Sequence, residues 1–206
     1  MNFSDLKKRI EEKGITYNEY ISNTIEEISK TQITDLPPGE VRRFNYKNLN
    51  LQRSTRIIRT YHPSKELKRV LDEITGMQLW MVITENWCGD SGQNLPYIAV
   101  MALQNPLIDL KLLLRDSNPD VMDQFLTNGT RSIPILVSFN SRGEELFRWG
   151  PRPRAAINLI SQWKSEGCEK PEWTEKLHLW YSRNRGEEIE KELADLINKV
   201  ELTYLE

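Results

Sequence analysis

From residue 76 onward, apolar segments alternate with amphipathic segments along the chain. The run Leu79–Thr84 is apolar at nearly every position, which is typical of a strand covered on both faces. Further apolar runs follow, each bounded by turn-forming residues. The pattern predicts strands at residues 79–84, 107–114, 133–139 and 145–149, with a hairpin turn at residues 140–143.

Helices are predicted between and after these strands. The segment that opens at residue 89 keeps helical character to Ala102, and Pro96 inside it should kink the helix. Asn118 followed by Pro119 is typical of a helix start, and that helix should end before Gly129. A last helix follows Pro151 and runs through Ile157, Ile160 and Trp163. This order is a βαβ unit followed by a β-hairpin and a helix, which indicates an α/β fold.

The first third of the chain is mainly helical in pattern. Thr16 and Glu19 form a capping box ahead of an apolar stripe, so helices are predicted at residues 4–13 and 17–30. Leu36–Gly39 is interpreted as a turn, and residues 40–53 show no clear pattern. Arg56–Tyr61 is interpreted as a short strand, with its basic residues on a solvated face.

A further helix and a helical tail complete the pattern. Pro63 and Ser64 open a helix that runs to Ile74. Residues 166–206 are predicted to be helical, with an amphipathic helix from Glu187 to Leu202. The expected organisation is a mainly helical N-terminal extension (1–62), an α/β domain (63–165) and a helical C-terminal extension (166–206). Packing of both extensions on the domain is favoured over the alternative of a partner-binding helix.

Composition and charge narrow the class of protein. The chain has 206 residues, 38% hydrophobic and 28% charged, with a formal net charge of −2. This balance favours neither nucleic acid nor an anionic membrane as a partner. No apolar run reaches the roughly 18 residues of a membrane span. The charged N-terminus and the count of two cysteines indicate a cytoplasmic protein without a disulfide framework. The oligomeric state is left open.

The position of Cys88 indicates thiol chemistry. It stands directly after a predicted buried strand and directly before a predicted helix. Free backbone N–H groups and the positive end of the helix dipole stabilise a thiolate at such a position. The thiolate is the nucleophile of thiol–disulfide exchange.

Three segments around Cys88, taken together and in order, resemble the thioredoxin family. Trp87-Cys88-Gly89 is similar to the active-site segment of that family, in which a proline and a second cysteine follow. Gly129–Pro134 is similar to the loop that leads into the cis-proline, and Trp149-Gly150 to the rim of the substrate groove. The stretch from Trp87 to Pro96 also resembles bacterial thioredoxin-like proteins with a Cys-Gly-Asp-Ser motif. The resemblance covers residues 76–163 and implies a thioredoxin-like fold, with a central mixed sheet and helices on both faces, in the domain at 63–165.

The resemblance also implies roles for individual residues. Cys88 matches the nucleophile, and Pro134 matches the cis-proline that would lie against it. Backbone groups of Ile133 would then be available to pair with a substrate strand. The implied site consists of Cys88 and Ser91 as catalytic residues and a substrate groove lined by Trp87, Gly89, Asp90, Ile133, Pro134 and Gly150.

The motif departs from the family at three positions. Ser91 replaces the resolving cysteine, so the second half of a dithiol cycle cannot take place within the chain. Val82 stands where the family buries an acidic residue that assists the resolving thiol. Asp90 replaces the intervening proline; its charge disfavours the thiolate, whereas the helix end and a Ser91 hydrogen bond favour it.

The second cysteine, the two histidines and two arginines near the motifs give weaker indications of function. A bond between Cys88 and Cys168 is not expected, because the last helix of the fold does not begin beside the active site. His62 and His178 have no metal-ligand spacing and are interpreted as surface or packing residues, so no metal or cofactor is expected. Arg131 and Arg152 lie near the motifs and could either favour acidic partners or be solvated.

Two functions from different classes remain open on the sequence alone. In the first, the protein is a monothiol oxidoreductase: Cys88 forms mixed disulfides with a protein or a low-molecular-weight thiol, and an external thiol resolves them. In the second, it is a redox-inactive thioredoxin-like module that binds extended protein segments. A third class, an iron–sulfur carrier, is not supported by any feature of the sequence.

Overall fold

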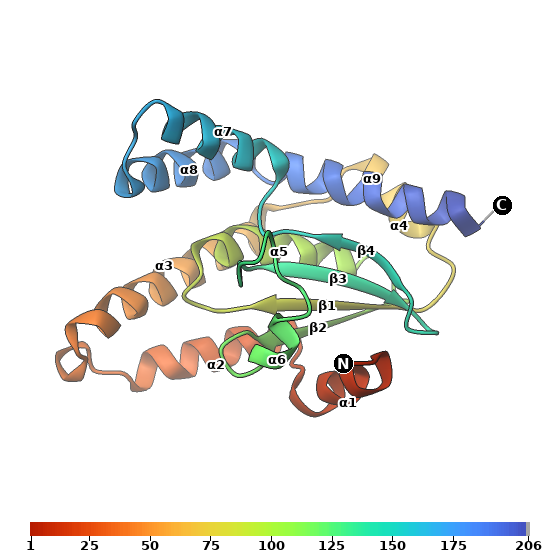
Figure 1. Cartoon of the computed structure of the whole chain (residues 1–206), viewed down its shortest axis with the longest axis horizontal. Helices are drawn as coiled ribbons and strands as arrows, with labels where there is room; N and C mark the ends of the chain where they lie inside the picture. Colours follow the sequence, from red (N-terminus) through yellow and green to blue (C-terminus); the bar gives the residue numbers. More distant parts are fainter. Residues whose placement is uncertain (205–206) are drawn as a thin grey trace.

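A four-stranded mixed sheet forms the centre of the computed structural model, which describes residues 1–204, with side chains up to residue 200 (Figure 1). The strands are β1 (Gln78–Thr84), β2 (Ile108–Leu114), β3 (Ile135–Asn140) and β4 (Glu145–Trp149). Their order across the sheet is β2-β1-β3-β4. β1 is parallel to β2 and antiparallel to β3, which is antiparallel to β4.

Helices surround this sheet. The helices that precede β1 are α1 (Phe3–Lys13), α2 (Tyr17–Lys30), α3 (Pro38–Thr60) and α4 (Lys65–Asp72), with a 3-10 turn η1 (Ile33–Asp35). The βαβ unit contains α5 (Gly89–Ala102), and α6 (Pro119–Met122) lies between β2 and β3. After β4 come α7 (Arg154–Ser165), α8 (Lys170–Asn184) and α9 (Glu187–Tyr204).

The strands bury both faces, because successive side chains point to opposite sides of the sheet. Trp80 and Val82 of β1 belong to a core cluster shared with α4, α5 and α9. Met81 and Ile83 belong to a second cluster shared with α1 and α6. Figure 1 shows α7, α8 and α9 along one side of the sheet, and α1 and α6 on the opposite side. The fold class predicted from the sequence, a mixed α/β sheet with helices on both faces, is confirmed.

One predicted strand is wrong. Residues 56–61, together with the unassigned stretch before them, belong to the 23-residue helix α3 and its C-cap. The buried positions of α3 are Asn50, Ser54 and Ile57, which have helical spacing. Two of the three are polar, so the buried face does not stand out as an apolar stripe. The basic residues of this stretch accordingly lie on a helix rather than on a strand face.

The C-terminal helix contributes to the main core. Ile189, Leu193 and Ile197 of α9 are at most 1% exposed and lie in the cluster that contains Trp80. α9 packs on α4 and β4, while α3 packs along α5. The boundaries predicted at residues 62 and 165 stay predictions, and residues 205–206 of the predicted C-terminal extension lie outside the described residues.

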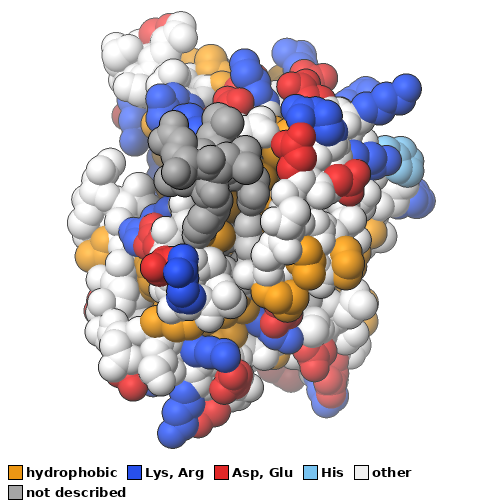
Figure 2. All heavy atoms as spheres, turned by 90° about the vertical axis from the view of Figure 1, so that its right-hand side faces the viewer, with side chains coloured by type: hydrophobic (Ala, Val, Ile, Leu, Met, Phe, Trp, Pro, Cys, Tyr) orange, Lys and Arg blue, Asp and Glu red, His pale blue; other side chains and the backbone are white. Residues whose placement is uncertain are grey.

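The surface carries charges of both signs. On the face shown in Figure 2, acidic and basic side chains are interspersed and hydrophobic side chains form small groups between them. No helix in the described part of the chain is long and apolar enough to cross a membrane. No cluster of histidine, cysteine and acidic side chains suited to a metal ion occurs among residues whose placement is described.

Candidate functional site

Cys88 lies where strand β1 passes into helix α5. It is the N-cap residue of α5, and its carbonyl accepts the first helical hydrogen bond, from Gly92 N at 3.0 Å. The residue is buried, with 9% of its surface exposed. Its thiol donates to the Ile133 carbonyl, with 3.4 Å between Sγ and O. The peptide bond between Ile133 and Pro134 is cis, so the loop that the resemblance placed against Cys88 lies there.

The surroundings of Cys88 favour the neutral thiol. Burial raises the pKa of Cys88, and the negative charge of Asp90 raises it further. Hydrogen bonding from Ser91 and from the Asp90 backbone opposes this rise, but its effect is smaller. Ser91 is only 1% exposed, and its Oγ has no hydrogen-bond partner of normal geometry among the described residues. The favourable helix end therefore does not outweigh burial.

Asp90 is held by groups from two distant parts of the chain. The carboxylate is 8% exposed and accepts a hydrogen bond from the Tyr181 hydroxyl of α8 at 2.9 Å. Its other oxygen lies 2.5 Å from Nη2 of Arg152, in the loop between β4 and α7. Asn94 connects the two sides, donating to the Asp90 carbonyl at 2.9 Å and to the Tyr181 hydroxyl at 3.1 Å. The charge that opposes the thiolate is thus partly neutralised by Arg152.

Helix α3 packs against the start of α5. The Asn50 side chain donates to the carbonyls of Asn86 at 2.9 Å and of Cys88 at 3.0 Å, and so fixes the turn that carries the thiol. Gly92 faces Asn50 so closely that a Cβ there would lie 2.7 Å from the amide carbon. Arg53 donates to the Asn50 amide oxygen at 3.1 Å. Arg53 has no carboxylate partner among the described residues.

Helix α8 covers the same helix start from another side. A Cβ at Gly89 would lie 3.1 Å from the imidazole of His178, so the ring rests directly on the residue after Cys88. Burial lowers the pKa of His178 to about 4, with smaller contributions from the charges of Arg53 and Arg152. The ring is therefore neutral at physiological pH, and its Nδ1 is buried without a partner.

The remaining groove residues predicted from the sequence lie around the thiol. The Trp87 ring is flanked by the guanidinium groups of Arg43, 5.0 Å from its centroid, and Arg115, at 4.8 Å. Gly150 has a φ of 122°, and a Cβ there would lie 2.2 Å from the Pro134 carbonyl oxygen. Only glycine fits such a close approach in that conformation.

The structure brings the predicted residues together and adds others that the sequence analysis did not find. Asn50, Arg53, His178 and Tyr181 come from the two flanking segments, and Arg152 comes from the loop between β4 and α7. No local pattern marks them, because their spacing from Cys88 along the chain is set by packing of whole helices. As a result, the turn that carries the buried Cys88 is flanked by residues of α3 and α8.

Cys168 takes no part in this site. It lies between α7 and α8, with its sulfur 3.1 Å from Lys176 Nζ and 3.2 Å from a Glu172 carboxylate oxygen. Both cysteines are free thiols.

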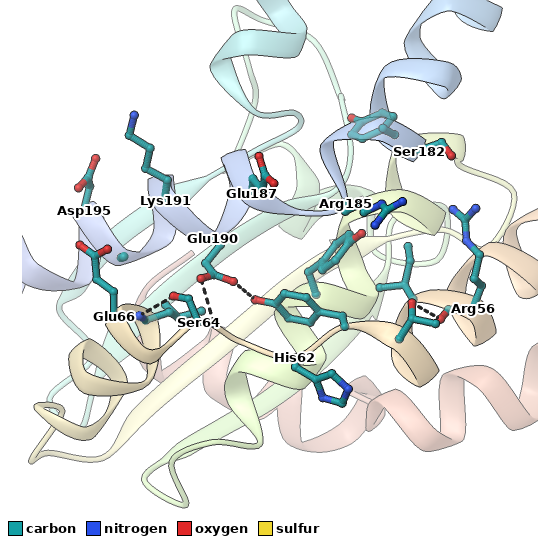
Figure 3. A pocket seen from close by; sticks show the side chains of 17 residues that line it. Arg56, His62, Ser64, Glu66, Ser182, Arg185, Glu187, Glu190, Lys191 and Asp195 are labelled. Atoms are coloured by element: carbon teal, nitrogen blue, oxygen red, sulfur yellow. Dashed lines mark hydrogen bonds between the residues drawn. The ribbon is translucent and has the colours of Figure 1, made fainter.

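A cavity of about 990 Å³ lies on the other side of Tyr181. Residues of α3, α4, α5, α8 and α9 line it, with Arg56 and Arg185 toward one end and Glu66 and Asp195 toward the other (Figure 3). Tyr181 both lines this cavity and donates to Asp90, so the cavity and the thiol site share one wall. Cys88 itself is not among the lining residues.

Two solved structures are similar to this chain in fold. A protein of unknown function from Pseudomonas aeruginosa has a TM-score of 0.56 and 17% identity, covering 81% of this chain and 89% of its own. An HIV epitope scaffold has a TM-score of 0.52 and 16% identity, covering 90% of this chain and 99% of its own. At these identities the likeness concerns the fold alone.

Sequence comparison supplies the family. None of the curated proteins matches the chain. A family model described as thioredoxin matches residues 43–164, which is more than half of the chain and includes both Cys88 and Pro134. The match begins within α3, the helix whose Asn50 side chain holds the active-site turn. The chain belongs to the thioredoxin family.

Proposed function

We propose that the protein is a monothiol thiol–disulfide oxidoreductase, with Cys88 as its nucleophile and a protein or a small disulfide as its substrate. One observation supports this most. Cys88 Sγ lies 3.4 Å from the carbonyl of Ile133, next to Pro134, while Ser91 occupies the place of a second thiol in the first turn of α5. The site therefore has the nucleophilic cysteine beside a cis-proline, as in thioredoxins, but it has no resolving cysteine.

The exchange step follows from these residues. The Cys88 thiol loses its proton to solvent, and the thiolate attacks one sulfur of a disulfide, forming a mixed disulfide. The other sulfur leaves as a thiolate and takes up a proton. An external thiol then attacks the mixed disulfide in the same way and releases Cys88. Each step exchanges one S–S bond for another, so the external thiol supplies the reducing equivalents.

The neighbouring groups set the rate of this reaction. A raised pKa leaves less thiolate at neutral pH but makes that thiolate more nucleophilic. The Ser91 hydroxyl can donate to the sulfur as negative charge develops there. The Asp90–Arg152 ion pair keeps a guanidinium close to the thiol. These features are those expected for slow thiol–disulfide exchange, in which an external thiol releases Cys88 after each reaction.

Intact-mass measurement after exposure to oxidised glutathione tests the proposal. We expect one glutathione adduct on Cys88, identified by peptide mapping, and its loss when reduced glutathione is added. Cys168→Ser serves as the background, because it removes the second thiol without touching the site. Absence of an adduct on Cys88 in that background would contradict the proposal.

A second candidate is a redox-inactive module that binds extended protein segments. It is favoured by the burial of Cys88, together with its raised pKa. In this case the thiol is dispensable. Immobilised wild-type protein and Cys88→Ser should then capture the same proteins equally well in the absence of both reductant and alkylating agent. Capture that depends on Cys88 and is reversed by a reductant supports the oxidoreductase instead.

A further inference from the structure

Unpaired hydrogen-bonding atoms gather around Cys88. Among the described residues, five buried side-chain nitrogen or oxygen atoms have no partner of normal geometry, and three of them belong to residues that form the start of α5 or contact it: Ser91 Oγ, Arg152 Nε and His178 Nδ1. Buried polar groups are normally paired, so a local cluster of unpaired ones calls for a missing partner. The Ser91 hydroxyl and the Arg152 Nε are donors at neutral pH. The Ser91 hydroxyl is directed at the Cys88 sulfur, so Arg152 Nε is the donor that lacks an acceptor.

The side-chain charges around the start of α5 also favour the binding of an anion. Asp90 is already bonded through both oxygens, to Tyr181 and to Arg152. Arg53 remains a half-buried guanidinium without a carboxylate among the described residues, 3.9 Å from the Cβ position of Gly89. The positive end of the α5 dipole adds to the positive potential beside Arg53, while the Asp90 and Ser91 N–H groups are directed at the Cys88 sulfur. The neutral His178 ring touches the same glycine.

We infer that the Cys88 site selects small thiols and disulfides that carry a carboxylate, which Arg53 binds at the start of α5. This inference rests on the proposed monothiol exchange and names its substrate class. Arg53 provides the unpaired charge, and the imidazole of His178 lies beside it over Gly89. A carboxylate bound beside Gly89 places a sulfur a few bonds away next to Cys88.

The atoms balance in this exchange. The Cys88 thiolate forms a bond to one sulfur of the carboxylate-bearing disulfide, and the bond between its two sulfurs breaks. The departing half leaves as a thiolate and is protonated by water. The thiolate of a second, different thiol then attacks the small-molecule sulfur of the mixed disulfide, so that a new disulfide forms and Cys88 leaves as a thiolate. No oxidant or reductant beyond this thiol–disulfide couple is needed.

A series of disulfides that differ mainly in charge tests the selection. Dithiodipropionate carries two carboxylates, bis(hydroxyethyl) disulfide is neutral, and cystamine carries two ammonium groups. Second-order rate constants for mixed-disulfide formation on Cys88 are measured by mass spectrometry in the Cys168→Ser protein. We expect the anionic disulfide to react at least about tenfold faster than cystamine, an advantage that high salt reduces.

Arg53→Gln should remove most of that advantage. Arg59→Gln is the matched control, because it removes the same charge from the same helix at an exposed position in its last turn. Equal rates for all three disulfides, or equal losses in the two variants, would overturn the inference and leave monothiol exchange standing. Failure of Cys88 to react with any of the three would overturn the proposed function, and this inference with it.

A binding measurement that needs no reaction separates the two claims further. The chain has two histidines, so the imidazole signals are readily resolved by NMR. In Cys88→Ser, methylthiopropionate should raise the pKa of His178 from its value of about 4, because a bound carboxylate stabilises the imidazolium. The neutral analogue methylthiopropanol should leave it unchanged. No difference between the two compounds would contradict carboxylate binding at this site.

Discussion

At the scale of single residues, the reactivity of Cys88 is a balance of three influences. Burial opposes ionisation most strongly, the Asp90 carboxylate opposes it further, and hydrogen bonds at the helix start favour it. The carboxylate does not act alone, because Arg152 lies 2.5 Å from it and Tyr181 donates to it. Changing the charge at position 90 therefore changes two things together. The thiol loses a negative neighbour, and the guanidinium loses its counter-ion.

Asp90→Asn should lower the pKa of Cys88. The substitution removes the repulsion between carboxylate and thiolate and leaves Arg152 unpaired beside the sulfur; both effects favour the charged form. The measurement is the pH profile of iodoacetamide alkylation in the Cys168→Ser background, in which reactivity follows the thiolate fraction. The profile should shift to lower pH, with faster alkylation near neutrality.

Asp116→Asn is the control for this experiment, because Asp116 is exposed and pairs with Arg115. It removes one negative charge away from the Asp90–Arg152 pair, so the profile of Cys88 should stay close to that of the wild type. An unchanged profile in Asp90→Asn would show that burial alone sets the reactivity of Cys88.

Local motifs identify only part of this site. Cys88, Pro134 and Gly150 each stand in a short segment with a recognisable turn or helix start, so the sequence predicts their neighbourhood. Arg53 and His178 lie 35 and 90 residues from Cys88 in the sequence, on helices with no motif of their own. Their approach depends on how α3 and α8 pack, which is decided by side-chain fit between helices that no single-segment pattern contains.

At the scale of elements, the contact between α3 and α5 determines how Cys88 is covered. α3 was difficult to predict because its buried face holds Asn50 and Ser54 beside Ile57. Those polar positions are explained by their partners, since Asn50 satisfies two backbone carbonyls at the active-site turn. Gly92 lets the two helices approach closely at this point. The apparent irregularity of the α3 sequence thus reflects its contact with the site.

Gly92→Ala should destabilise the protein by about 1–3 kcal/mol, despite the higher helix propensity of alanine. A Cβ at this position would lie 2.7–2.8 Å from Asn50 side-chain atoms, so α3 must move away from α5. The free energy of unfolding from urea denaturation measures the loss. Alkylation of Cys88 should become faster as the cover loosens.

Gly76→Ala is the matched control, because no atom lies within 4 Å of its Cβ position. It should change stability by less than about 0.5 kcal/mol, as surface substitutions usually do. Equal stability of the two variants would mean that α3 accommodates a methyl group at Gly92 without moving, contrary to this description of the interface.

At the scale of the whole molecule, the chain folds around one sheet with helices from both ends of the sequence. α9 returns to the face of the sheet that carries Trp80 and buries Ile189, Leu193 and Ile197 there. α8, just before it, brings His178 to Gly89 and Tyr181 to Asp90, the two residues that follow Cys88. The same segment therefore completes the core and covers the site.

Removal of residues 166–206 should abolish cooperative folding. Burial of each large apolar side chain of α9 is worth about 1.5–3 kcal/mol, so their combined loss is comparable with the total stability of a typical domain, about 5–15 kcal/mol. Urea denaturation followed by fluorescence provides the test. Leu193→Ala should show a partial loss of about 2–5 kcal/mol in the same assay. A shortened chain that still unfolds cooperatively with wild-type stability would contradict this expectation.

Centrally, we propose that Cys88 occupies an exchange site in which Ser91 replaces the resolving thiol. Ser91→Cys in the Cys168→Ser background tests it, because it restores a thiol in the first turn of α5. The measurement is the mass of the protein over time after glutathione has been attached to Cys88. We predict that Ser91→Cys releases glutathione on its own, forming a disulfide between Cys88 and the new thiol, while the protein with Ser91 intact keeps the adduct until an external thiol is added. Persistence of the adduct in both proteins, or its spontaneous loss from both, would contradict the claim.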